Sequence, residues 1–317
     1  MMRSRRPSLL LRILIVLLVL VSQVWLVSAA APKAATSADL HAAFLRPAAA
    51  TDVTIGYKVT LDAKGTTPKG KPTKPAATAA TGELGTLCDG TKYALVMGIN
   101  DYPGTSSDLS FCVADAESVR TVLVDHYGFA SGNVTFLKDR QVTRQAIDDY
   151  VQSLEGKVTS ADEVVFFYSG HGSKGRADDG DSLKTDQAIV VCNSTYTGFD
   201  FVWDGELKSI FSILDTTRVL FAFDSCYAGG MTVLGAPGRE VVMACTSTAL
   251  SYESSAYGGG HGAFTWYYFC QGMDAGYADI KPDDDQVTAE EAFDYAKANL
   301  GSQTPVLNDK FTNDLLP

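Results

Sequence analysis

The sequence contains few cysteines, and their spacing is irregular. Its 317 residues include six cysteines, scattered between positions 88 and 270. This distribution excludes a small disulfide-stabilised scaffold, and a chain of this length can bury enough apolar surface to fold without disulfides. Four cysteines lie in apolar surroundings and are predicted to be ordinary buried residues: Cys112, Cys192, Cys245 and Cys270.

Basic residues are also scarce. Lysine and arginine together number 26 against 37 acidic residues, which gives a net charge of −11. Four of the arginines lie in the first 12 residues, so the chain without that segment has 22 basic residues, 37 acidic ones and a net charge of −15. Such a surface is poorly suited to phosphate backbones and attracts basic peptides. We therefore expect peptide or protein substrates with basic residues, and no nucleic acid.

The N-terminus has the layout of a secretory signal peptide. Residues 1–12 are basic, residues 13–27 are almost wholly apolar, and small residues for cleavage follow. The alternative is a retained membrane anchor, because the apolar stretch approaches the ~20 residues that span a bilayer. Ser22 and Gln23 interrupt the run and favour cleavage. We predict a signal peptide over residues 1–31 and a secreted, periplasmic or otherwise extracytoplasmic protein, anchored in a membrane only if this segment is retained.

Residues 32–86 are rich in alanine, threonine, proline and lysine. With few large apolar side chains, such a stretch cannot bury enough surface to offset its chain entropy. We predict a largely disordered prosegment or linker here, in which the alternating segment Val53–Leu61 adds at most one strand. The folded domain is expected over residues 87–317.

From Lys92 onward, strand-like and helix-like segments alternate. Such alternation favours an α/β fold with a mainly parallel central sheet and helices on both faces. Threonine caps mark the starts of two helices, at Thr143 and at a Thr288/Glu291 capping box. The expected strands are 93–99, 134–137, 163–171, 188–191, 218–224 and 240–244, and the expected helices are 114–127, 143–154, 205–214, 262–272 and 288–299.

Two of the apolar runs end in reactive residues, His171 and Cys226. If their strands are parallel neighbours, the carboxyl ends lie side by side, where open α/β sheets place their sites. An imidazole can take the proton of a thiol and leave a nucleophilic thiolate. The adjacent glycines allow sharp turns, and the N–H groups of Gly172 and Cys226 are the expected donors to an oxyanion. Cys226 is therefore expected to be unpaired.

The segments Tyr168–Gly172 and Asp224–Gly229 resemble the histidine and cysteine motifs of the caspase-like cysteine peptidases, especially metacaspases and orthocaspases. The resemblance runs from about residue 92 to at least residue 276, and His171 precedes Cys226 by 55 positions, close to the ~50 of caspases. The Gln-Ala-Cys signature of true caspases is absent. The resemblance implies a three-layer caspase-haemoglobinase fold and endopeptidase activity through a His171/Cys226 dyad and a thioester acyl-enzyme.

The stretch Leu109–Ala116 is similar to a metacaspase segment in which a cysteine and an aspartate line the specificity pocket. The resemblance implies that Cys112, Asp115 and Asp224 bind the substrate. Two carboxylates at the base of a cleft select lysine or arginine before the scissile bond. A simpler role for Asp115 is a favourable interaction with the dipole of the helix that it begins, and the two roles are compatible.

Two other functions remain open for the same motifs. A catalytically silent relative would use the cleft to bind basic peptides, and a clostripain- or gingipain-like peptidase would share the dyad and the preference for basic residues. The retained dyad favours an enzyme, and the Cys112/Asp115 pattern favours the metacaspase type. Basic residues at Lys174, Arg176 and Lys184 suggest self-processing in an exposed loop.

The chemistry requires no cofactor, and calcium is a candidate activator. The loop Asp178–Asp186 occupies the position of an acidic metacaspase stretch that is linked to calcium, although its pattern is degraded. Clustered oxygen ligands suit calcium, and a solvated acidic loop is an equal alternative, so the identity of any metal ligands is left unknown. The segment Asp279–Glu291 lacks the central glycine of an EF-hand and is rejected. His261 is expected to begin a helix outside the dyad.

Overall fold

The computed structural model describes residues 34–61, 79–301 and 303–317, and the described residues from 37 onward form one compact unit. The predicted signal peptide, residues 1–31, lies outside the described residues. In the described part of the chain, no helix is both long enough and apolar enough to cross a membrane.

A six-stranded sheet forms the centre of this unit, in the order β13-β10-β9-β5-β3-β4. Five of the strands are parallel, and only β13 is antiparallel to its neighbour. Every residue of the central strands β5 and β9 is buried, because both faces of the sheet are covered. The bounds are β3 (Lys92–Gly98), β4 (Val134–Lys138), β5 (Glu163–Ser169), β9 (Val219–Asp224), β10 (Arg239–Met243) and β13 (Val306–Asp309).

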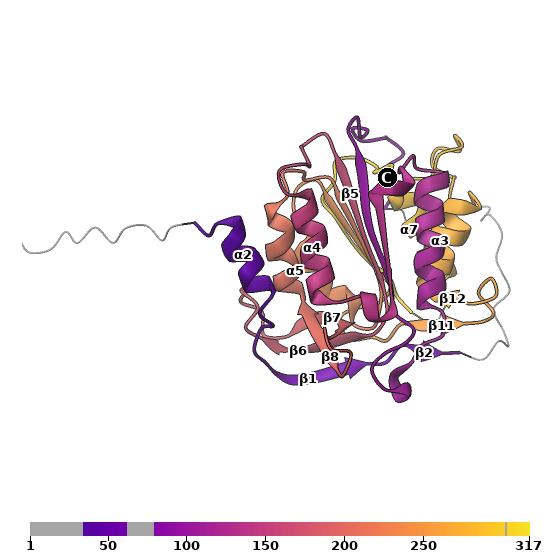
Figure 1. Ribbon diagram of the computed structural model, residues 1–317. Helices are drawn as coiled ribbons and strands as arrows, with labels where there is room; N and C mark the ends of the chain where they lie inside the picture. The colour runs from indigo at the N-terminus through magenta and orange to yellow at the C-terminus, as the bar shows by residue number, and fades with distance from the viewer. Residues whose placement is uncertain (1–33, 62–78, 302) are drawn as a thin grey trace, which may run out of the picture. The chain divides into compact units, whose positions relative to one another are not determined.

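Helices cover both faces of the central sheet, as expected for the three-layer α/β fold (Figure 1). On one face lie α3 (Cys112–Asp125) and α7 (Ala289–Asn299), and on the other lie α4 (Arg144–Leu154) and α5 (Asp204–Ile210). Thr143 caps α4 and the Thr288/Glu291 box caps α7, as predicted. The predicted helix 262–272 is a short α6 (Ala263–Thr265) that continues as the π-helix η6 (Trp266–Asp274).

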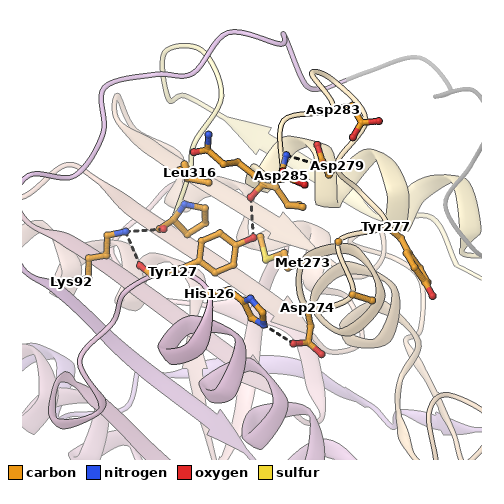
Figure 2. A pocket seen from close by; sticks show the side chains of 15 residues that line it. Lys92, His126, Tyr127, Met273, Asp274, Tyr277, Asp279, Asp283, Asp285 and Leu316 are labelled. Carbon is orange, nitrogen blue, oxygen red and sulfur yellow. Dashed lines mark hydrogen bonds and ion pairs between the residues drawn. The ribbon is translucent and has the colours of Figure 1, made fainter.

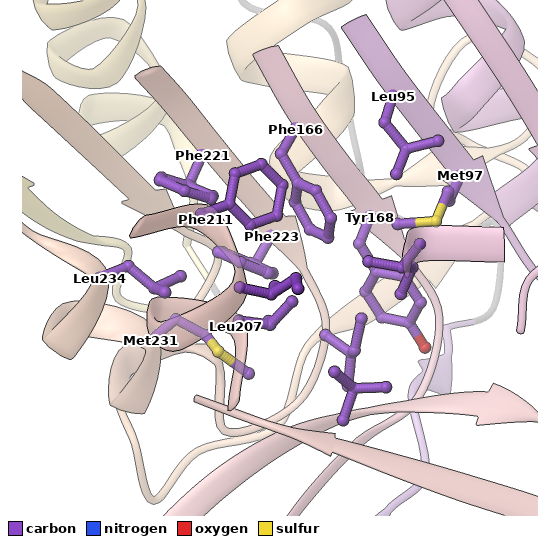
Figure 3. Packing of buried hydrophobic residues seen from close by; sticks show 14 of the residues in the cluster. Leu95, Met97, Phe166, Tyr168, Leu207, Phe211, Phe221, Phe223, Met231 and Leu234 are labelled. Atoms are coloured by element: carbon purple, nitrogen blue, oxygen red, sulfur yellow. The ribbon is translucent and has the colours of Figure 1, made fainter. Parts of the chain in front are cut away.

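Aromatic side chains fill the space between the sheet and the α5 side (Figure 3). Phe211 packs edge-on against Phe166 and Phe221, with ring centroids 5.4 and 5.0 Å apart. Burying each such ring contributes roughly 1.5–3 kcal/mol, and edge-to-face pairs add to it. This packing fixes β5 and β9 next to each other.

A second, antiparallel sheet follows directly from the carboxyl end of β5, in the order β1-β6-β7-β8. The segment 188–191, predicted as a strand, belongs to this sheet as β7 (Asp186–Cys192). Its neighbours β6 (Gly172–Ala177) and β8 (Phe199–Trp203) were not predicted, because partly polar strands lack a clear apolar run. A third, small sheet contains β2 (Val59–Thr60), β11 (Tyr252–Ser254) and β12 (His261–Gly262).

The prediction that residues 32–86 are largely disordered is wrong for residues 37–60. They form α2 (Ser37–Phe44), β1 (Ala50–Gly56) and β2. Here β1 completes the edge of the second sheet against β6, and β2 pairs with β11. His41 of α2 bonds to Asp148 of α4 at 2.7 Å. A segment with few apolar residues can be ordered in this way, because it docks onto edges that the rest of the domain has formed. Residues 62–78 of the predicted linker lie outside the described residues.

Candidate active site

His171 and Cys226 lie at the same edge of the central sheet. Ser169 and Asp224, the last residues of β5 and β9, are paired in register, and each reactive residue follows two positions later. The backbones of the two loops touch: a Cβ added to Gly172 would lie 1.8 Å from the carbonyl oxygen of Cys226. Only glycine fits at this contact, so the predicted dyad and the predicted oxyanion donors share one corner of the fold.

The imidazole of His171 is almost fully buried, with 1% of the residue exposed. Its Nε2 lies 2.7 Å from the carbonyl oxygen of Ser107, and its Nδ1 accepts the backbone N–H of Lys58 at 3.2 Å. A nitrogen that faces a carbonyl must carry the proton, so this geometry assigns the neutral Nε2–H tautomer. Burial lowers the pKa of His171 to about 4. Stacking on Tyr102, at 4.6 Å between centroids, fixes the ring.

The thiol of Cys226 is also buried, and its Sγ accepts the backbone N–H of Ser251 at 3.2 Å. Burial raises the pKa of Cys226 to about 11, so the thiol is neutral near pH 7. All six cysteines are unpaired, as expected for Cys226, and the four predicted to be ordinary buried residues are buried. Since both nitrogens of His171 have other partners, neither is hydrogen-bonded to this thiol.

Asp115 and Asp224 lie close together at the predicted specificity pocket, and both are fully buried. Asp224 accepts the hydroxyl of Ser251 at 2.7 Å and both the N–H and the hydroxyl of Thr265. Asp115, in the first turn of α3, accepts the hydroxyl of Ser169 at 2.7 Å. These hydroxyls hold both carboxylates toward one point in the interior.

His261 contributes to the same pocket, although it is not part of the dyad. Its Nδ1 lies 3.1 Å from Asp115, and its ring stacks on Trp266 at 5.6 Å between centroids. The residue therefore contacts one of the two carboxylates of the predicted specificity pocket. It begins a two-residue strand, β12, rather than the helix expected from the sequence.

The ammonium group of Lys58 occupies the pocket. It lies 2.9 Å from the carboxylate of Asp224 and 3.6 Å from that of Asp115. It also donates to the hydroxyl of Ser169 at 3.0 Å and lies 3.8 Å from the sulfur of Cys112. Burial alone would lower the pKa of Lys58, but the neighbouring acidic groups, Asp224 first among them, together outweigh burial and raise the pKa well above its ordinary value. The predicted substrate-binding residues Cys112, Asp115 and Asp224 thus surround one lysine.

Lys58 is the main feature that the sequence analysis missed. It was assigned to a disordered prosegment, and contacts across more than 50 positions cannot be predicted from local patterns. One signal was present: a single lysine interrupts an alternating apolar segment. Ser169, Ser251 and Thr265 were missed for the same reason, because their roles depend on three separate segments meeting.

A cluster of four aspartates lies at the acidic loop. Ligand oxygens of Asp179, Asp181, Asp186 and Asp204 lie within 4.8 Å of one another. Asp204, at the start of α5, was not predicted. One oxygen each of Asp186 and Asp204 is buried without a hydrogen-bond partner. Burial and the neighbouring Asp179 raise the pKa of Asp204 to about 9.

A cavity of about 650 Å³ lies near the amino end of β3, away from the dyad (Figure 2). Lys92, the first residue of β3, bonds there to the carbonyls of Tyr127 and Pro317, and His126 bonds to Asp274. These polar groups of the cavity are thus hydrogen-bonded within the protein. Neither His171 nor Cys226 lines the cavity.

A histidine and a cysteine at the ends of adjacent parallel strands, in a three-layer α/β fold, define the class of caspase-like cysteine peptidases. The family model described as the caspase domain matches residues 91–316. The chain therefore belongs to the caspase domain family.

Known relatives agree with this assignment. The chain is 33% identical over 153 residues to Metacaspase-4 of Arabidopsis thaliana, which covers 44% of this chain and 34% of that protein. It is 31% identical over 152 residues to Metacaspase-1 of Schizosaccharomyces pombe, with 45% and 35% covered. The matches thus span about a third of the length of these curated relatives. The solved structure of protein GSU0716 from Geobacter sulfurreducens shares the fold, with a TM-score of 0.52, 20% identity, and 71% and 95% of the two chains covered.

Proposed function

We propose that this chain is a cysteine endopeptidase that hydrolyses peptide bonds after lysine or arginine. The observation that carries this proposal is the lysine side chain bound between two buried carboxylates, next to the Cys226 and His171 loops. A pocket that holds one ammonium group in this way can hold the same group of a substrate. Arginine has a planar guanidinium that can pair with both carboxylates.

In the proposed reaction, His171 takes the proton of Cys226, and the thiolate attacks the carbonyl carbon of the basic residue. The N–H groups of Gly172 and Cys226 donate to the resulting oxyanion. The imidazolium then returns the proton to the leaving amine, the C–N bond breaks, and a thioester remains. Water, deprotonated by His171, hydrolyses the thioester and regenerates the thiol.

The test is turnover of fluorogenic peptides that end in arginine, lysine or aspartate. Cys226→Ala should abolish turnover, whereas Cys88→Ala, a half-buried thiol far along the chain from the dyad, should retain it. Asp224→Asn should lower kcat/KM for arginine and lysine peptides by at least tenfold. Equal rates for Cys226→Ala and the unmodified protein would disprove the assignment.

Calcium is proposed as an activator at the cluster of Asp179, Asp181, Asp186 and Asp204. Four carboxylates, two of which have buried oxygens without partners, fit a hard cation that prefers oxygen ligands. Asp186 begins β7, and the next residue, Gln187, packs against Gly230 in the turn that follows Cys226. A cation here would therefore fix the strand that supports the nucleophile loop. Activity with and without calcium, in the parent protein and in Asp204→Asn, tests this role.

Self-processing and export complete the proposal. The expectation of an exposed loop is wrong for Lys174 and Arg176, because both belong to strand β6, and it holds for Lys184 between β6 and β7. The side chain of Arg176 is nevertheless 72% exposed, and Lys174 lies over the ring of Tyr227 at 4.5 Å. Mass spectrometry of the unmodified protein and of Cys226→Ala should reveal cuts after Lys174, Arg176 or Lys184 only in the former.

Determining the N-terminal residue of the mature chain would test the signal peptide, and an intact Met1 in the exported protein would contradict its cleavage.

A further inference from the structure

The two residues of β12, His261 and Gly262, lie against the predicted specificity pocket. A Cβ added to Gly262 would collide with Oδ2 of Asp224 and would lie 2.9 Å from Oδ2 of Asp115. Only glycine fits between these two carboxylates. His261 directly precedes this close contact, so the same stretch of backbone places its ring beside the pocket.

The two oxygens of Asp115 make different contacts. Oδ1 accepts the backbone N–H of Gly262 at 2.8 Å and lies 3.1 Å from Nδ1 of His261. Oδ2 accepts the hydroxyl of Ser169 and lies 3.6 Å from the ammonium group of Lys58. A ring nitrogen that faces an ionised carboxylate must carry a proton, so Nδ1 of His261 is the donor whether the ring is neutral or charged. The imidazole thus anchors one oxygen of Asp115 and leaves the other to the cation.

The orientation of Asp115 should matter more for an arginine in the pocket than for a lysine. The ammonium group of Lys58 lies 2.9 Å from Asp224 and only 3.6 Å from Asp115, so one near carboxylate supplies most of its pairing. An ammonium group is a compact charge, whereas a planar guanidinium needs acceptors that are oriented along its N–H bonds. A carboxylate that turns freely therefore loses more affinity for arginine than for lysine.

The ring of His261 is itself fixed by packing. It stacks on Trp266 with 5.6 Å between the ring centroids. The preceding residue, Gly260, has a φ of 144°, and a Cβ added there would collide with the ring of Phe111, so the chain can reach His261 by this path only through glycine. The side chain of His261 is 12% exposed and lines a surface cavity of about 520 Å³. The ring therefore meets the buried carboxylate of Asp115 and is also open to small solutes from the cavity.

We propose that His261 is a positioning residue of the specificity pocket, which orients Asp115 and thereby sets the preference for arginine over lysine. The inference rests on the proposed peptidase function and deepens it. His261 acts through Asp115, since its ring contacts the oxygen that faces away from Lys58. Without the imidazole donor, Asp115 keeps its bonds from Gly262 and Ser169 but turns more freely.

The experiment separates the donor of His261 from its bulk. His261→Phe keeps a flat ring next to Trp266 and removes the N–H donor, whereas His261→Asn keeps a donor near the place of Nδ1 and loses the ring. His126→Phe is the matched control, because His126 also bonds to an aspartate, Asp274 at 2.9 Å, but lies outside the pocket. For each protein, kcat and KM are measured with two fluorogenic peptides that differ only in ending with arginine or lysine.

His261→Phe should lower kcat/KM for the arginine peptide by roughly tenfold, the effect of one lost hydrogen bond to a charged group, and for the lysine peptide by less. The loss should lie in KM, because the pocket holds the side chain equally in the ground state and the transition state. His261→Asn should recover most of the arginine preference, and His126→Phe should leave it unchanged. Added imidazole should restore arginine cleavage in His261→Ala, since the cavity opens onto the vacated place.

A binding measurement keeps this inference distinct from the proposed function. Lys58→Gln removes the pocket's own cation, and this protein is titrated calorimetrically with agmatine and cadaverine, the decarboxylated forms of arginine and lysine. Adding His261→Phe should weaken the binding of agmatine more than that of cadaverine. If this occurs while no protein cleaves any peptide, the peptidase function fails and the positioning role stands.

Two results would overturn the positioning role while the peptidase function stands. The first is an arginine-to-lysine ratio and a KM in His261→Phe that equal those of the parent protein. The second is an equal loss for both peptides together with a lower Tm, which neither His261→Asn nor imidazole relieves, because it would reduce His261 to a packing residue.

Discussion

Replacing Lys58 by methionine tests how much free energy its ion pairs contribute. The change removes the ammonium group that lies between the buried carboxylates of Asp224 and Asp115, and the loss of one partner from a buried ion pair costs about 3–5 kcal/mol. Asp224 keeps its hydrogen bonds from Ser251 and Thr265, so we expect the lower end, ~3 kcal/mol of unfolding free energy. The measurement is urea denaturation at pH 7 in the Cys226→Ala background, which prevents self-cleavage.

The cost should vary with pH in a defined direction. Burial opposes ionisation of Asp115, but Lys58, His261 and Ser169 together outweigh burial, so the pKa of Asp115 is lowered. A lowered carboxyl pKa contributes stability above its unfolded value of about 4, and this stability is lost as the pH falls through the folded value. The difference between Lys58→Met and its parent should therefore be larger at pH 7 than below pH 4, and it should shrink as the pH falls.

A double-mutant cycle with Asp224→Asn isolates the pair. We expect the double variant to be less destabilised than the sum of the single changes, by ~1–3 kcal/mol, because the second change removes the charge that the first left unpaired. Lys174→Met is the control and should cost less than ~1 kcal/mol, as exposed or half-exposed charges do. A cost below ~1 kcal/mol for Lys58→Met, with additive effects in the cycle, would refute the reasoning.

Three further predictions follow from other contacts. Gly172→Ala should lower both Tm and activity, since its Cβ would collide with the Cys226 carbonyl; an unchanged Tm would show that the loops separate freely. Without calcium, the raised pKa of Asp204, about 9, means that unfolding free energy falls between about pH 4 and 9, and Asp204→Asn should flatten this dependence in thermal unfolding curves. Phe166→Ala should cost ~3–5 kcal/mol in urea unfolding, because this ring packs against Phe211 and Phe221; a loss under ~1 kcal/mol would contradict that packing.

The central sheet could be predicted because each of its strands has a recognisable local sequence pattern. Each parallel strand is a short apolar run closed by glycine or a polar residue, and the runs that end before His171 and Cys226 are neighbours in the sheet, as their patterns suggested. The pairing of β1 with β6 and of β2 with β11 could not be predicted in this way. Their strands are polar or only two residues long, and they are ordered by edges formed elsewhere in the sequence.

The cover that residues 56–58 provide also explains why His171 and Cys226 are both uncharged in this structure. His171 is neutral because burial lowers its pKa, and Cys226 is neutral because burial raises its pKa. Both effects depend on the exclusion of water, and residues 56–58 supply part of the cover over these two side chains. The positive charge of Lys58 lowers the pKa of Cys226, but this effect ranks below burial, so removing the segment should shift the thiol pKa down. The imidazole pKa should shift up, since water returns and a positive neighbour leaves. Proton transfer from sulfur to imidazole then becomes easier from both sides, so one displaced segment both opens the pocket and activates the nucleophile.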